Sequence, residues 1–425
     1  MAGPFAPAVG RVNGPRADRG AAALLAWLPG PGQESSVRHR VYLVPGFFGF
    51  ANLGDLAYFG HVRDELRRAF AARGAALEVH AVVTWPTASL RRRAARLLET
   101  IGETVQAGDI VHVIGHSSGG LDARLALTPA VSLPTGADVE AVAARVRSLV
   151  TVATPHRGTP VAAFFAGLMG QKALQVLSLA TMYVLRFGRL PLGAVLRLGA
   201  AFAWLDGQVG VNSLLLDQLF EQLLGDFSRD RRDAIARLLA DVERDRALLP
   251  QLAPEAMDVF DALVRERAGL RRACVVTQAS PPGVISQLGV GLDPSAHATH
   301  LVYQGLYRIA AQGQADLAGR ADERQRDALR RGLGALPGPE ANDGVVPTWS
   351  QLDGEVLAAV RADHLDVLGH YRDPQAVPPR YDWLTTGSGF DTPTFRRVWD
   401  VVAGFLVSEQ PSGAGDSPPG PSTPR

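Results

Sequence analysis

One serine in the chain lies in a setting typical of an enzyme nucleophile. Ser117 is the centre of Gly115-His-Ser-Ser-Gly119, a match to the pattern Gly-x-Ser-x-Gly. The apolar run 110–114 predicts a buried strand before the motif, and 121–127 predicts a helix after it. Between strand and helix, the motif indicates a sharp, strained turn that exposes the hydroxyl beside a helix N-terminus. A chance turn is the alternative in a chain with 45 glycines.

A serine hydroxyl is a poor nucleophile near neutral pH, so it needs a base and a group that orients the base. In folds with this turn, a carboxylate and then a histidine follow the serine along the chain. Asp343 lies in a predicted loop, Asn342-Asp-Gly-Val-Val-Pro347, and His364 follows the strand-like run 356–360. We therefore predict Ser117 as nucleophile, Asp343 as orienting acid and His364 as base.

Three other histidines compete with His364 for the role of base. His116 adjoins the nucleophile, but a sharp turn directs adjacent side chains differently. His156 comes before the long insertion, which breaks the expected order, so we interpret it as structural. His370 is the serious competitor, because it follows His364 by only six residues in a helix-like run.

The negative charge that develops on an attacked carbonyl oxygen needs two backbone N–H donors. The amide of Ser118, next after the nucleophile, is one predicted donor. The amide of Phe47 is the other, since Pro45-Gly-Phe-Phe-Gly49 follows the first predicted strand at the same sheet edge. An ordinary turn is the alternative interpretation of that loop.

The elements that must position these residues alternate between strand and helix patterns. Strand patterns cover 41–44, 77–83, 110–114, 146–152, 273–277 and 356–360. Helix patterns cover 55–72, 89–105, 121–127, 299–312, 321–333 and 394–408. This alternation predicts an α/β fold with a mostly parallel sheet, helices on both faces and a site at the carboxyl ends of the strands.

Residues 161–273 interrupt the alternation with helical patterns alone. Segment 161–205 is unusually apolar, but its longest uncharged run, between Lys172 and Arg186, is too short to cross a bilayer. Either it is a buried helical subdomain, or it is a cap whose apolar face contacts a lipid surface. The predicted organisation is a flexible segment 1–40, a core of 41–160 and 274–408, the helical insertion 161–273 and a disordered tail 409–425.

Composition excludes several classes of protein. A content of 47% hydrophobic and 20% charged residues is typical of a globular protein, and a net charge of +1 gives no reason to expect a nucleic-acid partner. The single cysteine, Cys274, excludes an internal disulfide and a cysteine-based metal cluster. It fits a reducing compartment, so we predict a cytoplasmic location. Secretion is the alternative, because 21–28 faintly resembles a signal peptide.

Taken together, the motifs resemble the bacterial triacylglycerol lipases of the α/β-hydrolase fold. The resemblance covers about 41–160 and 340–371, and the matching stretches are Gly115-His-Ser-Ser-Gly-Gly120 with Asp122-Ala-Arg124, Thr154-Pro-His-Arg-Gly158, Asn342-Asp-Gly-Val-Val346 and His364-Leu-Asp366. It implies an α/β-hydrolase fold and the roles given above for Ser117, Asp343 and His364, whereas the helical insertion has no matching motif. The family usually has His-Gly where this chain has Pro45-Gly46.

The family also often binds a structural calcium ion through the carboxylate two residues after the histidine, here Asp366. Asp363 and Asp366 flank His364, and each is a candidate for capping or ion binding. One carboxylate does not make a calcium site, and the sequence does not identify its partner. No other metal or cofactor is predicted.

We interpret the chain as a serine ester hydrolase that acts on lipid esters, such as acylglycerols, through an acyl-enzyme. The same three residues also suit an acyltransferase or a polyester depolymerase, because an acyl-enzyme does not dictate its acceptor. A hydrolase-fold binding protein without turnover is a further alternative. The intact serine, aspartate and histidine set argues against it.

Overall fold

A single parallel sheet organises the part of the chain that the structure, a computed structural model, describes: residues 38–47, 58–187, 190–203, 213–283, 286, 290, 294–312, 317–377 and 379–408. Within these residues six strands pair in the order β2-β1-β3-β4-β5-β6. They are β1 (Arg38–Val44), β2 (Ala76–Ala81), β3 (Ile110–His116), β4 (Val146–Val152), β5 (Arg271–Gln278) and β6 (Glu355–Arg361). All five pairings are parallel. The predicted α/β fold is therefore confirmed.

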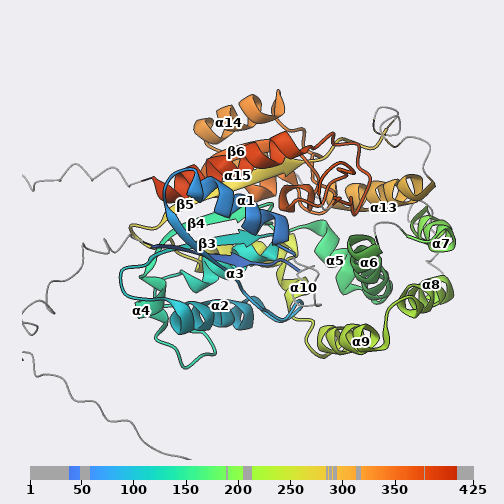
Figure 1. The fold of residues 1–425 in the computed structure, drawn as a ribbon, viewed down its shortest axis with the longest axis horizontal. Helices are drawn as coiled ribbons and strands as arrows, with labels where there is room; N and C mark the ends of the chain where they lie inside the picture. Colours follow the sequence, from blue (N-terminus) through green and yellow to red (C-terminus); the bar gives the residue numbers. More distant parts are fainter. Residues whose placement is uncertain are drawn as a thin grey trace, which may run out of the picture. The chain divides into compact units, whose positions relative to one another are not determined.

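Alternate residues of each strand face opposite sides of the sheet, and each side is covered by helices (Figure 1). Val41 and Leu43 pack in the core with α1 (Gly60–Ala71) and α15 (Thr392–Val407). Tyr42 and Val44 pack on the other face with α2 (Leu90–Thr104), α3 (Ser118–Ala126) and α4 (Val139–Ala143). At the end of the sheet, β5 and β6 pack against α14 (Glu323–Leu333).

Several boundaries and one element differ from the sequence predictions; residues 271–273, for example, assigned above to the insertion, are the start of β5. Residues 38–40, assigned above to the flexible segment, are the start of β1, and the Arg40 guanidinium donates to Asp109 at 2.6 Å. The short helix α4 was missed, since its five residues give too little periodicity; Asp138 caps it. The predictions for residues 1–37 and 409–425 lie outside the described residues, and so does the start of the helix predicted over 55–72.

The regular elements that the structure describes between β4 and β5 are all helices, joined by loops. These helices are α5 (Pro160–Ala166), α6 (Leu168–Phe187), α7 (Leu192–Ala203), α8 (Ser213–Gly225), α9 (Arg229–Arg244), α10 (Leu248–Gln251) and α11 (Pro254–Leu263). Helices α6 to α9 gather beyond α5 in Figure 1, and α7 packs against α13 (Pro294–Ala310).

No single described helix is both long and apolar enough to cross a membrane. The pair Pro160–Ala166 and Gly170–Val184 passes by length and composition together, but it is bent by 107°.

Candidate active site

The serine of the motif occupies a strained turn between β3 and α3. Ser117 has φ 54° and ψ −134°, a conformation that few residues other than glycine adopt. The turn is possible because glycines surround it. A Cβ on Gly115 would lie 2.5 Å from the Cα of Gly120, and one on Gly119 would collide with the carbonyl of Val44. Strand and helix therefore approach as closely as the motif requires.

The three residues predicted to act together lie in hydrogen-bond contact. The Nε2 of His364 is 3.0 Å from the Oγ of Ser117, and its Nδ1 is 2.9 Å from the Oδ2 of Asp343. Ser117 is 6% exposed, while His364 and Asp343 are 0% exposed. His364 follows β6, and Asp343 lies in the loop after α14, so both reach the carboxyl edge of the sheet, where β3 presents Ser117.

The carboxylate of Asp343 is held by four further donors. Its Oδ1 accepts the amides of Val345 and Val346 at 2.9 and 2.7 Å. Its Oδ2 accepts the hydroxyl of Thr277 at 2.8 Å and the side-chain amide of Gln351 at 3.3 Å. The sequence analysis missed Thr277 and Gln351, since a threonine at a strand end and a glutamine in a short helix carry no motif.

The loop of the second predicted oxyanion donor lies against the nucleophile. A Cβ on Gly46 would collide with the Cβ of Ser117 and lie 3.0 Å from its Oγ. Phe47 is the next residue of this loop, and Ser118 begins α3, so both predicted donors come from segments that touch Ser117.

A buried arginine holds the loop at Pro45 and Gly46 through its backbone. Arg93 of α2 donates at 2.7 Å to the carbonyl of Pro45 and at 2.8 Å to the carboxylate of Asp122 on α3. It also donates to the carbonyl of Trp85 at 2.7 Å. The arginine and Asp122 are both 0% exposed, so each charge depends on the other for compensation. This clamp ties the loop at Pro45 to the helix that follows Ser117.

The competing histidines bond elsewhere. The ring of His116 contacts the hydroxyl of Tyr58 and the backbone carbonyl of His364. His156 contacts Thr151 and Arg124, and burial lowers its pKa to about 3. His370 contacts the carbonyl of Tyr58 at 3.2 Å, and burial lowers its pKa to about 4.

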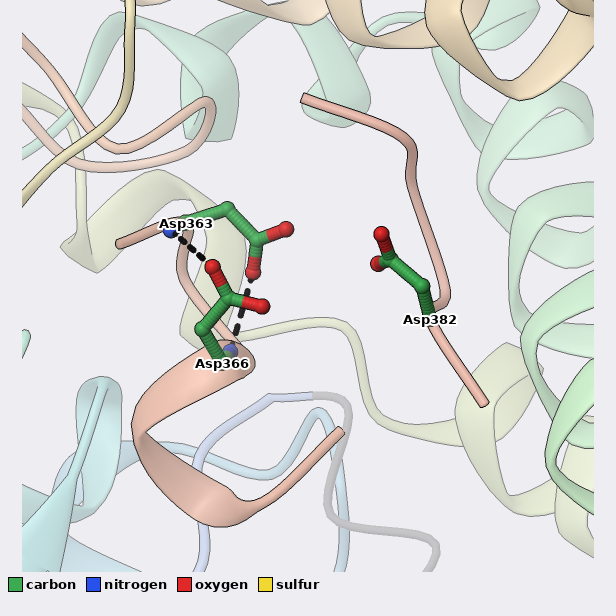
Figure 2. A group of neighbouring side chains, drawn as sticks. All are labelled: Asp363, Asp366 and Asp382. Carbon is green, nitrogen blue, oxygen red and sulfur yellow. Dashed lines mark hydrogen bonds between the residues drawn. The ribbon is translucent and has the colours of Figure 1, made fainter. Parts of the chain in front are cut away.

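Three carboxylates converge behind the loop of His364 (Figure 2). Ligand oxygens of Asp363, Asp366 and Asp382 lie within 4.8 Å of one another, and Figure 2 shows Asp382 facing the other two from a separate segment. Asp363 and Asp366 accept each other's backbone amides at 2.9 and 3.0 Å. Asp382 is the residue that the sequence analysis missed, because nothing in the sequence brings it to this loop.

The environment of these carboxylates fits a hard cation. Burial and then the neighbouring carboxylates raise the pKa of Asp363 and Asp382 well above the usual range, and burial raises the pKa of Asp366 to about 6. The Oδ2 of Asp363 is buried without a hydrogen-bond partner. An oxygen-only donor set with an unpaired buried carboxylate oxygen suits Ca²⁺ better than a soft metal ion.

The strand order, the strained serine turn and the serine–histidine–aspartate contacts define the α/β-hydrolase class of proteins. No known protein family and no curated protein matches this chain by sequence.

Among solved structures, the chain is similar to lipase 1 from Pelosinus fermentans, at 17% identity and a TM-score of 0.48 over 88% of this chain and 99% of that one. A metagenomic carboxyl esterase is similar at 17% identity and a TM-score of 0.46, over 90% of this chain and 81% of that one. Staphylococcus hyicus lipase is similar at 14% identity and a TM-score of 0.43, over 89% of this chain and 97% of that one. At such values the likeness adds nothing to the functional argument, which rests on this chain's own side chains.

Proposed function

We propose that this chain is a serine hydrolase of carboxylic esters and that its substrates are lipid esters. The observation that carries the proposal is the pair of contacts on His364, to Ser117 at 3.0 Å and to Asp343 at 2.9 Å. A carboxylate on Nδ1 fixes the proton there and leaves Nε2 as the acceptor that a serine nucleophile needs.

In the proposed reaction, the Oγ of Ser117 forms a bond to the ester carbonyl carbon as its proton passes to Nε2 of His364. The amides of Phe47 and Ser118 stabilise the resulting oxyanion. The tetrahedral intermediate then breaks its bond to the alcohol oxygen, which takes the proton from His364. Water attacks the acyl-enzyme by the same route, and the acid leaves.

A lipid substrate is supported by the exposed apolar side chains of the insertion. Most apolar side chains of α6 are buried, in the same core cluster as one face of the sheet, which fits a buried helical subdomain. On α7, however, Leu192 and Leu196 are 57% and 63% exposed, and Leu214 of the adjoining α8 is 60% exposed. Leucines four residues apart lie on one side of a helix, so α7 offers an apolar face that suits transient contact with a lipid surface.

The direct test is labelling by an active-site phosphonate, followed by peptide mapping, together with turnover of p-nitrophenyl and triglyceride esters. Label on Ser117, and loss of several orders of magnitude in turnover for Ser117→Ala and His364→Ala, would support the proposal. His370→Ala should keep turnover. If it abolished turnover while His364→Ala did not, the base would be His370. Folded protein that takes no label and turns over no ester would instead favour a binding protein.

We also propose that Asp363, Asp366 and Asp382 hold a structural calcium ion beside His364. The bound ion would screen the repulsion between the buried carboxylates and order the loop that carries the base. Chelation should lower the melting temperature, and added calcium should restore it by mass action. Asp382→Asn should reduce this calcium dependence, whereas Asp258→Asn, at an exposed position of α11, should leave it intact. A melting curve that a chelator does not change would remove the ion from this proposal.

A further inference from the structure

A buried chain of hydrogen bonds connects the oxyanion loop to the loop of the base. The hydroxyl of Tyr58 is 2.6 Å from Nδ1 of His116, and Nε2 of His116 is 2.9 Å from the backbone carbonyl of His364. The backbone of Gly46 also hydrogen bonds to the Tyr58 hydroxyl. Tyr58 is 7% exposed and His116 is 0% exposed, so water does not substitute for these partners.

The direction of every bond in this chain follows from the chemistry of its members. A carbonyl oxygen only accepts, so Nε2 of His116 carries the proton that it shares with His364. A neutral imidazole then accepts at Nδ1, and the Tyr58 hydroxyl donates to it. That oxygen remains free to accept the Gly46 N–H. Each donor therefore meets an acceptor, without a conflict.

Burial keeps both members neutral. It lowers the pKa of His116 well below the usual range, and it raises the pKa of Tyr58. The neutrality of His116 matters because its ring centroid lies 4.7 Å from that of His364. A positive charge there would oppose the imidazolium that forms when His364 accepts the serine proton. The neighbour of the nucleophile thus supports the base without competing for the proton.

We infer that Tyr58 and His116 are positioning residues that hold the oxyanion loop at Gly46 and the backbone of His364 in a fixed relation across the turn that carries Ser117. This inference rests on the proposed ester hydrolysis. Tyr58 and His116 do not touch the substrate; they act through Gly46 and His364. Both loops must contact the same reacting carbonyl. Misplacement of either loop by a fraction of an ångström would therefore lower kcat strongly and weaken substrate binding only slightly.

The test is steady-state kinetics of Tyr58→Phe on a soluble p-nitrophenyl ester. Removal of the hydroxyl leaves two buried groups without their partner, and we expect kcat to fall roughly tenfold to a hundredfold with KM changed by less than about twofold. Tyr42→Phe is the matched control. Tyr42 is also buried, and its hydroxyl contacts Thr104 at 2.7 Å on the far side of β1. It should lose comparable thermal stability and keep its kcat.

A second pair of variants covers the case in which Tyr58→Phe does not fold. His116→Gln retains an N–H donor toward the His364 carbonyl, whereas His116→Leu has none. The glutamine variant should recover most of the kcat that the leucine variant loses. Equal kcat for both, or a wild-type kcat for Tyr58→Phe, would overturn the inference. The proposed function fails separately, if Ser117→Ala itself keeps its turnover.

Discussion

Replacement of Asp343 by asparagine tests the orientation of the base with little change of shape. Two backbone amides donate to Oδ1, at 2.9 and 2.7 Å, so the carbonyl oxygen of an asparagine must occupy that position. Its NH₂ group then faces Nδ1 of His364, where Oδ2 of Asp343 now lies at 2.9 Å. An N–H donor at this place forces Nδ1 to accept, and the imidazole proton moves to Nε2.

The wrong tautomer directs an N–H at Ser117 and removes the acceptor for the serine proton. In a serine protease with the same arrangement, this change lowers kcat by about 10⁴-fold, equivalent to about 5.5 kcal/mol in the barrier. We expect a similar loss here. Stability should fall less, because the two backbone amides keep their acceptor. The Thr277 hydroxyl, which donates to Oδ2 at 2.8 Å, can turn to donate to Oε1 of Gln351 at 3.1 Å, so the contact at 3.3 Å from the Gln351 amide is the one left donor against donor.

The assay is ester turnover of Asp343→Asn, with thermal unfolding as the check on folding. Thr277→Val is the matched control, since it removes the hydroxyl donor at 2.8 Å from the same carboxylate without changing the tautomer. It should lose about tenfold in kcat, in line with one hydrogen bond. A folded Asp343→Asn variant that keeps more than about a tenth of the wild-type kcat would refute the orienting role of Asp343.

Three further predictions concern the turn at Ser117, the buried His156 and the helical insertion. Gly115→Ala should destabilise by about 1–3 kcal/mol or more in chemical denaturation, because its Cβ would lie 2.5 Å from Gly120; Gly136→Ala, with open space around it, should not. Burial lowers the pKa of His156 from its ordinary value of 6.5 to about 3 in the folded state, so its contribution to stability is present above pH 6.5 and is lost as pH falls toward 3. Between pH 3 and 6.5, His156→Gln should lower the slope of the unfolding free energy against pH by up to about 1.4 kcal/mol per pH unit. An unchanged slope would contradict the conclusion that burial keeps His156 neutral in this range. Leu196→Asp should blunt a rise in rate above the solubility limit of a short-chain ester, whereas Val259→Asp, equally exposed on α11, should not; smooth saturation in the wild type would leave only the buried-subdomain interpretation.

The sheet could be predicted from the sequence because each strand contains a short run rich in apolar residues between turn residues, and all six predicted runs correspond to strands. The convergence of Ser117, Asp343 and His364 could also be predicted, since the order along the chain and the carboxyl edge of a parallel sheet constrain where each lies. The groups around them could not. Thr277, Gln351 and Arg93 reach the site through contacts with residues far from them in the sequence, and no local pattern identifies such contacts. Asp382 was missed for the same reason. Cytoplasmic location remains a prediction that rests on one cysteine.

At Pro45 this chain lacks the histidine that the resembling lipases usually carry in the predicted oxyanion loop, and contacts to the backbone hold the loop instead. Arg93 donates a hydrogen bond to the backbone carbonyl of Pro45 at 2.7 Å, and this carbonyl is present whatever side chain residue 45 carries. Proline also fixes its own φ and has no N–H that would need a partner. The next contact is made at Gly46, where the absence of a side chain allows the loop to reach Ser117. Because Arg93 binds a backbone carbonyl of the loop and is itself paired with the buried Asp122, we expect the position of Phe47 to depend more on this pair than on a side chain at residue 45.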